Sequence, residues 1–258
     1  MSISSQERIL SIAHWSERLV SFTTTRSSLL DSSPALTVPL GDEGVVTHSI
    51  NDQRAGSRTL EFLHLDVAGA RSRNLARQLD VGDTVTVHAS AAGPALERLL
   101  PGRRLHVLAA DDGIAAGLQA AFHAQAGARY EQVVLIHEVA RIDRVAFHDL
   151  IQQRLLGSAV DVGYHCVVRE PFDRGAGLVE RLLRDEASQA LRIAPLDSRL
   201  DRVLAFATAP VIHDGRRALA AHGFSEASDA RSGSFLVAAI PGQATSTRPG
   251  LQRERRVA

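Results

Sequence analysis

Residues 100–118, with the sequence LPGRRLHVLAADDGIAAGL, constrain the fold of this chain more than any other stretch. They predict a turn at Pro101-Gly102, a buried strand over residues 105–109, a tight loop at Asp111-Asp112-Gly113 and the start of an apolar helix. A strand that runs through a glycine-containing loop into a helix is how α/β proteins offer backbone N–H groups to a phosphate. We therefore expect this stretch to be the seam between two domains, and the place where a nucleotide would bind.

Before the seam, apolar and polar residues alternate in short runs, which is typical of antiparallel strands. Two strands joined by a polar turn are expected within residues 8–22, and further strands over 35–40, 45–50, 60–67 and 84–88, with a short helix over 71–79. Several short strands and one helix in a segment of this length predict a small closed β-barrel. We assign residues 1–100 to this antiparallel barrel domain.

After the seam, strands and helices alternate. Strands are expected over residues 105–109, 132–137, 162–168, 202–207 and 234–240, and helices over 114–125, 145–155, 175–185 and 213–222. This alternation predicts a five-stranded parallel sheet covered on both faces, in an α/β domain over residues 101–240. The polar segment 241–258, which bears Pro and Gly and is basic at its end, is expected to be a disordered tail.

The composition argues against several functional classes. The formal net charge is zero, so no overall field recruits nucleic acid or an anionic membrane. Cys166 is the only cysteine, which excludes an internal disulfide and a thiolate cluster and suits a reducing compartment. It lies in a predicted buried strand and is expected to act as a small hydrophobe. No histidine spacing indicates a metal site, and no apolar run reaches the ~20 residues that span a bilayer, so the expected location is the cytoplasm.

Six runs of sequence carry a resemblance to a known family. They are RILSIAHWSERLVSFTTTR at 8–26, TLEFLHLDV at 59–67, LARQLDVGDTVTV at 75–87, LLPGRRLHVLAADDG at 99–113, VVLIHEVAR at 133–141 and VVRE at 167–170. On these runs the chain resembles the bacterial ferredoxin/flavodoxin–NADP reductases over residues 7–240. The resemblance implies an FAD-binding barrel and an NADP-binding α/β domain. It also implies electron transfer from NADPH through FAD to a ferredoxin, a flavodoxin or another redox protein.

The resemblance also points to residues that would hold FAD. The family's Arg-x-Tyr-Ser, whose arginine pairs with the pyrophosphate and whose tyrosine stacks on the flavin, aligns with Val46-Thr47-His48-Ser49. Valine cannot make that charge-assisted contact, whereas His48 could stack and Ser49 is retained. The second pyrophosphate contact aligns with the predicted helix start, where Ser72, or Arg71 and Arg73, could compensate. The alternative is that these two arginines are solvated helix charges.

At the seam, the family's Gly-Thr-Gly-x-Ala-Pro aligns with residues 111–116, and Gly113 is the glycine that stays in place. Asp111 and Asp112 replace the Gly-Thr pair that precedes this glycine in the family. An aspartate at this point is expected to cap the helix and to repel an incoming phosphate.

Other nucleotide motifs are altered as well. Ala207-Thr208-Ala209-Pro210 aligns with the family's Cys-Gly-x-Pro motif. Ala238 stands where the family has an acidic residue. Arg169 keeps the arginine expected near the 2′-phosphate side of NADPH, although a surface pair with Glu170 or Asp173 would also explain it.

Three functional hypotheses follow. The favoured one is a reductase-like protein that has lost normal flavin and NADPH catalysis and acts as a binding or regulatory partner in redox metabolism. The alternative is an active NADPH-dependent FAD oxidoreductase that passes electrons to ferredoxin or flavodoxin. A third is binding of a different nucleotide or small ligand in the crevice between the domains.

Overall fold

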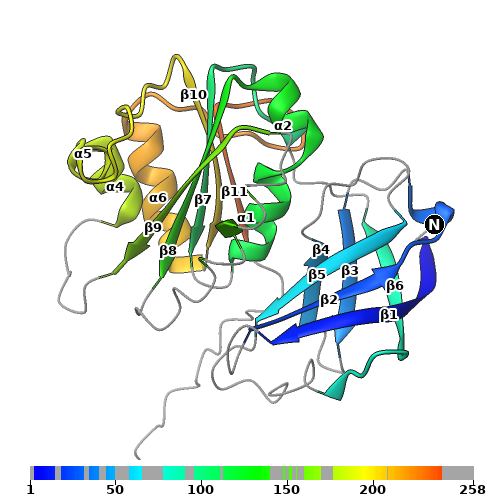
Figure 1. Cartoon of the computed structure of the whole chain (residues 1–258). Coiled ribbons are helices and arrows are strands. Elements are labelled where there is room, and N and C mark those ends of the chain that lie inside the picture. Colours follow the sequence, from blue (N-terminus) through cyan, green and yellow to red (C-terminus); the bar gives the residue numbers. More distant parts are fainter. Residues whose placement is uncertain are drawn as a thin grey trace, which may run out of the picture.

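The fold is taken from a computed structural model of the chain. The structure describes residues 3–14, 19–31, 35–40, 45–49, 58–65, 78–90, 96–110, 113–139, 148, 151–152, 155, 160–169, 177–207 and 209–239. Within these ranges the chain forms a closed β-barrel and then a five-stranded parallel sheet (Figure 1). The predicted fold class is confirmed.

The barrel consists of β1 (Ser4–His14), β2 (Leu19–Thr25), β3 (Ala35–Leu40), β4 (Val45–Ser49), β5 (Thr59–Leu65) and β6 (Thr84–Ser90). Its strands follow the order β1-β2-β5-β4-β3-β6, and every neighbouring pair is antiparallel. A short 3₁₀ helix, η1 (Ser28–Leu30), follows β2. Each predicted strand of this region is present. The helix predicted over 71–79 lies largely outside the described residues.

The alternation of strand β5 decides which side chains fill the barrel. Leu60 and Phe62 lie in the barrel core, where the ring of Phe62 stacks on that of Phe22 with 5.3 Å between centroids. Leu63 points the other way and packs into the core of the α/β part of the molecule. This alternation is the one expected for a half-buried strand, and it makes β5 a contact between the two parts.

The parallel sheet consists of β7 (Arg104–Ala110), β8 (Gln132–Val139), β9 (Val162–Val168), β10 (Asp201–Ala207) and β11 (Phe235–Ala239). Its spatial order is β11-β10-β7-β8-β9, and all four pairings are parallel. The predicted strands match these elements closely, because apolar runs of this length are typical of strands buried on both faces.

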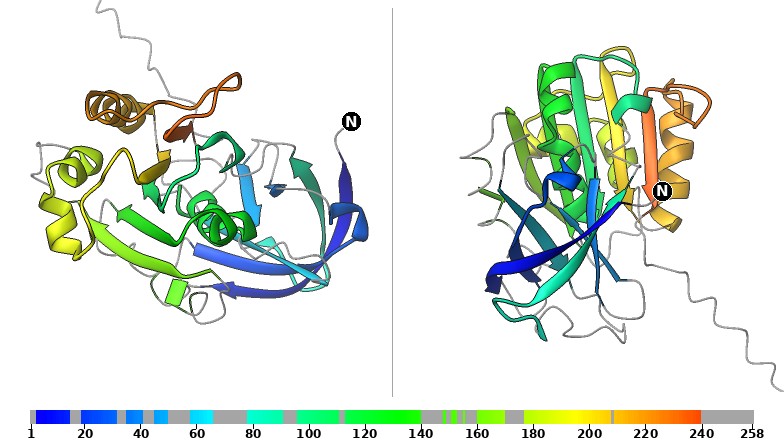
Figure 2. Two further views of the ribbon diagram at one scale, coloured as in Figure 1. Left: turned by 90° about the horizontal axis from the view of Figure 1, so that it is seen from above. Right: turned by 90° about the vertical axis from the view of Figure 1, so that its right-hand side faces the viewer.

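Helices cover the two faces of the sheet. They are α1 (Ile114–Ala121), α2 (Ala124–Arg129), α4 (Leu178–Leu183), α5 (Glu186–Leu191) and α6 (Ala209–Ala221). Helices α1 and α2 pack on one face, and α4 and α6 on the other (Figure 1). Helix α1 also contacts strand β4, so it lies between the sheet and the barrel, as the two views of Figure 2 show.

Two predictions for this region were wrong in detail. The helix expected over residues 114–125 is interrupted, because His123 takes an extended conformation and its Nδ1 accepts a hydrogen bond from Gln125 N at 3.2 Å, which starts α2. Strand β9 is half-buried rather than buried, since it is an edge strand, and Cys166 is therefore only partly covered. The helix expected over 145–155 and the tail over 241–258 fall mostly or wholly outside the described residues.

Two arginines hold the segment that joins the barrel to the sheet, which contains the 3₁₀ helix η3 (Leu96–Arg98). Arg129 donates to the carbonyl oxygens of Leu96 and Leu99, the latter at 2.6 Å. Arg202 on β10 donates to the carbonyl oxygens of Leu100, at 3.2 Å, and of Pro101. Both arginines belong to the α/β part, so the linker is fixed to that part by charge-assisted hydrogen bonds.

In the described part of the chain, no helix is long and apolar enough to cross a membrane.

Candidate functional site

The strand order locates the edge of the sheet at which a ligand is expected. The chain starts in β7, moves outward through β8 to β9, and then returns to the other side of β7 to form β10 and β11. The direction of strand addition therefore reverses between β7 and β10. In open α/β sheets, ligands bind outside the carboxyl ends of the strands at such a reversal. Helix α1 begins at this point, directly after β7 (Figure 1).

Gly113 stands at the reversal and is the N-cap residue of α1. Its φ of −69° is available to any residue, so the backbone conformation does not require glycine. The close approach to β10 does: a Cβ at this position would lie 2.5 Å from the carbonyl oxygen of Phe206. The glycine is thus explained by close packing of a helix start on a strand, which is one of the roles glycine takes in nucleotide-binding turns.

The expectation that an aspartate caps this helix was wrong, because the N-cap is Gly113, which has no side chain to accept a hydrogen bond. The packing against Phe206 leaves no room for a larger residue at that position. Asp111 and Asp112 lie outside the described residues. The predicted contact of Gly113 with a nucleotide stays a prediction.

His48 and Ser49, the two residues expected to hold FAD, lie on strand β4. The backbone of His48 pairs with Thr37 on one side and Leu63 on the other, and that of Ser49 pairs with Phe62. Leu63 is the residue through which β5 packs on the α/β part, and β4 itself contacts α1. His48 is therefore carried by the strand that faces the start of the α/β domain. Arg71, Ser72 and Arg73 lie outside the described residues.

Arg169 follows the last residue of β9 and pairs with a carboxylate that the sequence analysis did not single out. Its Nη2 lies 2.7 Å from Oε2 of Glu138 on the neighbouring strand β8. The Glu138 side chain is 6% exposed and the Arg169 side chain 38% exposed. The backbone N–H of Arg169 donates to the carbonyl oxygen of Val139 at 2.8 Å, which fixes the end of β9 against β8. The other expected partners, Glu170 and Asp173, lie outside the described residues.

Glu138 could have been found in the sequence. It interrupts the apolar run QVVLIHEV one residue before the strand ends. A carboxylate at the carboxyl end of a buried strand is rarely left unpaired, and it often serves a ligand or an ion pair. The structure brings it together with Arg169 at the carboxyl edge of the sheet, where a ligand is expected.

Beside that edge, strand β9 carries the partly buried Tyr164 and Cys166, next to the buried His137 of strand β8. Nδ1 of His137 lies 3.4 Å from the hydroxyl oxygen of Tyr164. Burial raises the pKa of Tyr164, and the neighbouring Cys166 thiol raises it further. Burial also raises the pKa of the Cys166 thiol, and the hydrogen bond with Tyr164 offsets this only in part. Both groups are therefore neutral at pH 7, which supports the prediction that Cys166 is not a nucleophile.

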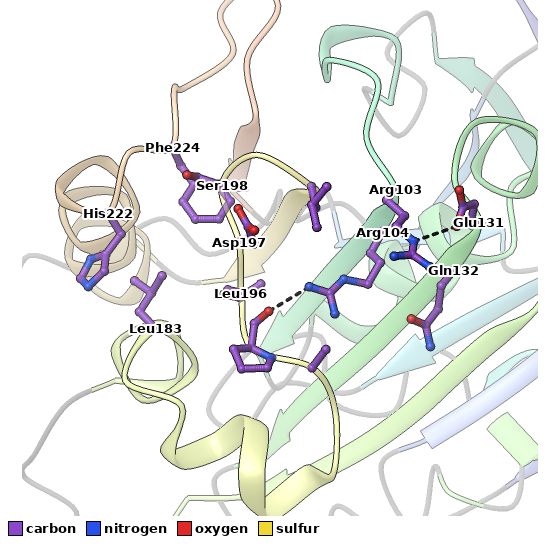
Figure 3. A pocket seen from close by; sticks show the side chains of 13 residues that line it. Arg103, Arg104, Glu131, Gln132, Leu183, Leu196, Asp197, Ser198, His222 and Phe224 are labelled. Carbon is purple, nitrogen blue, oxygen red and sulfur yellow. Dashed lines mark hydrogen bonds and ion pairs between the residues drawn. The ribbon is translucent and has the colours of Figure 1, made fainter.

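A large cavity lies at the opposite, amino-terminal edge of the sheet (Figure 3). Its volume is about 970 Å³, and its lining includes Arg103, Arg104 and Phe224. Arg103 pairs with Glu131 at 2.9 Å on the exposed rim. Arg104 reaches the carbonyl oxygen of Pro195 at 2.8 Å, the bond drawn in Figure 3. The two cations that line the cavity are thus engaged in internal contacts.

Behind this cavity lies a buried charged cluster. Asp201 is fully buried and accepts hydrogen bonds from Arg104 and from the backbone N–H of Asp197. Nε2 of the buried His106 lies 3.7 Å from the same carboxylate. Burial alone would raise the pKa of Asp201, but the His106 imidazole, the Arg104 guanidinium and the Asp197 N–H outweigh it and hold the pKa below its usual value.

The residues present fit a flavin in part. In the described part of the barrel, strand β4 supplies the hydroxyl-bearing Ser49 and the aromatic His48, and it lies against the helix that begins at the ligand edge. Position 46 is valine, so this strand supplies no cation at the point where the family pairs an arginine with pyrophosphate.

Comparison with known proteins agrees with this architecture. No family model matches the sequence. The ferredoxin–NADP reductase A of Sorangium cellulosum is 27% identical over 246 residues, covering 90% of this chain and 88% of that protein. The ferredoxin–NADP reductase of Azotobacter vinelandii is 28% identical over 218 residues, covering 79% of this chain and 84% of that protein.

A solved structure shows the same fold. The crystal structure of a ferredoxin NADP⁺ reductase from Neisseria gonorrhoeae, with bound FAD and NADP, matches with a TM-score of 0.72 at 19% identity, covering 92% of this chain and 98% of that one. The sequence relatives match along most of both lengths, and the barrel and the parallel sheet are both present, so this chain is similar in sequence to ferredoxin–NADP reductases and shares the fold of that structure.

Proposed function

We propose that this protein is an FAD-dependent oxidoreductase that accepts hydride from a reduced nicotinamide nucleotide and delivers electrons to a ferredoxin or flavodoxin. The observation that carries the proposal is the presence of both structural parts, with strand β4 against helix α1 at the ligand edge of the sheet. The similarity to reductases over most of their lengths supports it.

In this proposal the barrel would hold FAD through His48 and Ser49, with Arg71, Ser72 and Arg73 supplying charge to the pyrophosphate. A bound flavin supplies the conversion between two-electron hydride chemistry and one-electron transfer. The residues of the chain itself would contribute by positioning the bound groups. Gly113 allows α1 to start directly against β10, and Leu63 fixes strand β5 on the α/β core. These contacts would hold the two proposed binding surfaces next to each other, which would orient the reactants.

The first test is an absorption spectrum of the purified protein between ~300 and ~550 nm, before and after FAD is added, because bound flavin absorbs strongly in this range. We expect flavin bands that remain after gel filtration, followed by oxidation of a reduced nicotinamide nucleotide in the presence of an artificial acceptor. A colourless protein that does not retain added FAD would contradict the proposal.

A second candidate is supported by the sequence of the same site. Val46 stands where the family pairs an arginine with the flavin pyrophosphate, and Ala207-Thr208-Ala209-Pro210 stands at the Cys-Gly-x-Pro motif. These substitutions favour a family member that binds a redox partner without catalysis. The spectrum separates the two candidates, since only the first requires a flavin.

A further inference from the structure

The carboxyl edge of the sheet carries an ion pair at the position where dinucleotide-binding sheets read the adenosine ribose. In a sheet with this strand order, an acidic residue after the second strand contacts the 2′-hydroxyl of NAD, whereas an arginine nearby accommodates the 2′-phosphate of NADP. The second strand here is β8, and Glu138 near its end follows Gly113 by 25 residues. Arg169 follows the third strand, β9. Both the acidic residue and the arginine are present here, and they form an ion pair with each other.

The surroundings make this pair strong. Glu138 is almost fully buried and lines a small apolar pocket of about 30 Å³ together with Leu178 and Val179. An ion pair on the edge of such an apolar region is less screened than one in water. The guanidinium is held at 2.7 Å, and withdrawing it from Glu138 would leave a buried carboxylate without that cation, which is costly.

We propose that Glu138 is a positioning residue that neutralises Arg169, so that the site prefers nucleotides with a free 2′-hydroxyl, such as NADH, over 2′-phosphorylated ones, such as NADPH. A 2′-phosphate gains little from an arginine whose charge is already balanced, and it is repelled by the carboxylate behind it. A 2′-hydroxyl carries no charge for that carboxylate to repel. This inference rests on the proposed function, because it requires that a nicotinamide nucleotide binds.

The test is isothermal titration calorimetry of the full-length protein with NADH and with NADPH. The wild type is expected to bind NADH at least about fivefold more tightly than NADPH. Glu138→Gln keeps the shape of the side chain but releases the charge of Arg169, so we expect it to tighten NADPH binding about tenfold, the effect of one charge-assisted contact. NADH binding should change less than about twofold, since its ribose carries no phosphate to gain the contact.

Two further variants sharpen the test. Glu131→Gln removes the same charge from the exposed Arg103 pair at the opposite edge, and it should leave the ratio of the two affinities unchanged. The double variant Glu138→Gln/Arg169→Gln should lose the tenfold gain in NADPH affinity that Glu138→Gln alone gives, because the released positive charge is then absent. If Glu138→Gln fails to fold, the ratio of NADH to NADPH affinity in the wild type still tests the inference.

The outcomes are distinguishable. If both nucleotides bind and the wild type prefers NADPH, or the double variant keeps the tighter NADPH binding of Glu138→Gln, the inference is overturned while the proposed function stands. An unchanged ratio of NADH to NADPH affinity in Glu138→Gln would also overturn the inference. If neither nucleotide binds the wild type or any variant, the proposed function fails, and the inference fails with it.

Discussion

The guanidinium of Arg104 donates from Nε and Nη2 to the two carboxylate oxygens of Asp201, at 2.6 and 2.7 Å, across the neighbouring strands β7 and β10. The Asp201 side chain is completely buried and that of Arg104 is 13% exposed. The pair lies at the amino-terminal edge of the sheet, far from the expected ligand edge. Its role is therefore to hold the two central strands together.

Asp201→Asn should destabilise the fold by about 3 kcal/mol, because it leaves a mostly buried arginine without its counter-charge. Urea unfolding followed by circular dichroism measures this. Glu131→Gln, which removes the partner of the exposed Arg103, should cost less than about 1 kcal/mol. Equal losses of stability in the two variants would contradict the role of the Arg104–Asp201 pair in holding the two strands together.

Asp201 should also make stability depend on pH. Its pKa is lowered in the folded state, so the unfolded chain binds a proton first as the pH falls. Its contribution is fully present above the ordinary value of 3.8 and is lost as the pH drops through the lower folded-state value. In acid titrations of stability below about pH 4, the wild type should fall more steeply than Asp201→Asn. Parallel curves would show that Asp201 has no such linkage.

Gly113→Ala should lower stability by about 1–3 kcal/mol, since the new Cβ would meet the Phe206 carbonyl oxygen at 2.5 Å. Gly177→Ala is a matched control, because Gly177 is also a helix N-cap and a Cβ there would meet nothing within 4 Å. Thermal unfolding of both variants provides the comparison. A loss in Gly177→Ala as large as that in Gly113→Ala would remove the packing argument.

Arg202→Met should cost about 2 kcal/mol, because methionine keeps an apolar stem but cannot donate to the carbonyl oxygens of Leu100 and Pro101. Arg199→Met, in the exposed turn just before β10, should be close to neutral. Limited proteolysis of the linker reports the same contact directly, and we expect faster cleavage near Leu100 only in Arg202→Met. Equal cleavage rates would contradict a clamping role.

Cys166 should react slowly with iodoacetamide at pH 7, because burial raises the pKa of its thiol and keeps it protonated. We expect alkylation, followed by mass spectrometry, to be several-fold slower in the folded protein than in urea. The rate should rise with pH and level off above the usual thiol range. Rapid alkylation at pH 7 would instead indicate an activated thiolate.

His48→Ala should lower the flavin content if the proposed function is correct, because it removes the aromatic ring expected beside the isoalloxazine. His222→Ala, at the exposed position directly after α6, provides a control with the same change of side chain. The ratio of flavin absorbance to protein absorbance after reconstitution measures the effect. An unchanged ratio in His48→Ala would assign flavin binding to other residues.

The sequence was sufficient to predict the order of the strands, because strand and helix periodicities differ. Helix α5 was not predicted. The break in the helix at His123 was not predictable, since a histidine that accepts a backbone hydrogen bond leaves no periodic signal. The pairings of Arg169 with Glu138 and of Arg104 with Asp201 were also missed. Each joins residues that neighbouring strands bring together, 31 and 97 positions apart, and so depends on sheet order and register.

The linker contacts bear on how this architecture can be recombined. Arg129 and Arg202 belong to the α/β part, yet they satisfy peptide oxygens of the chain that leaves the barrel. Leu63 of the barrel is likewise buried in the α/β core. A barrel transplanted without these partners would carry unsatisfied carbonyls and an exposed leucine. The natural unit of exchange is therefore the pair of domains with their junction, and chimaeras cut near residue 100 should fold only when both sides of that junction come from the same parent.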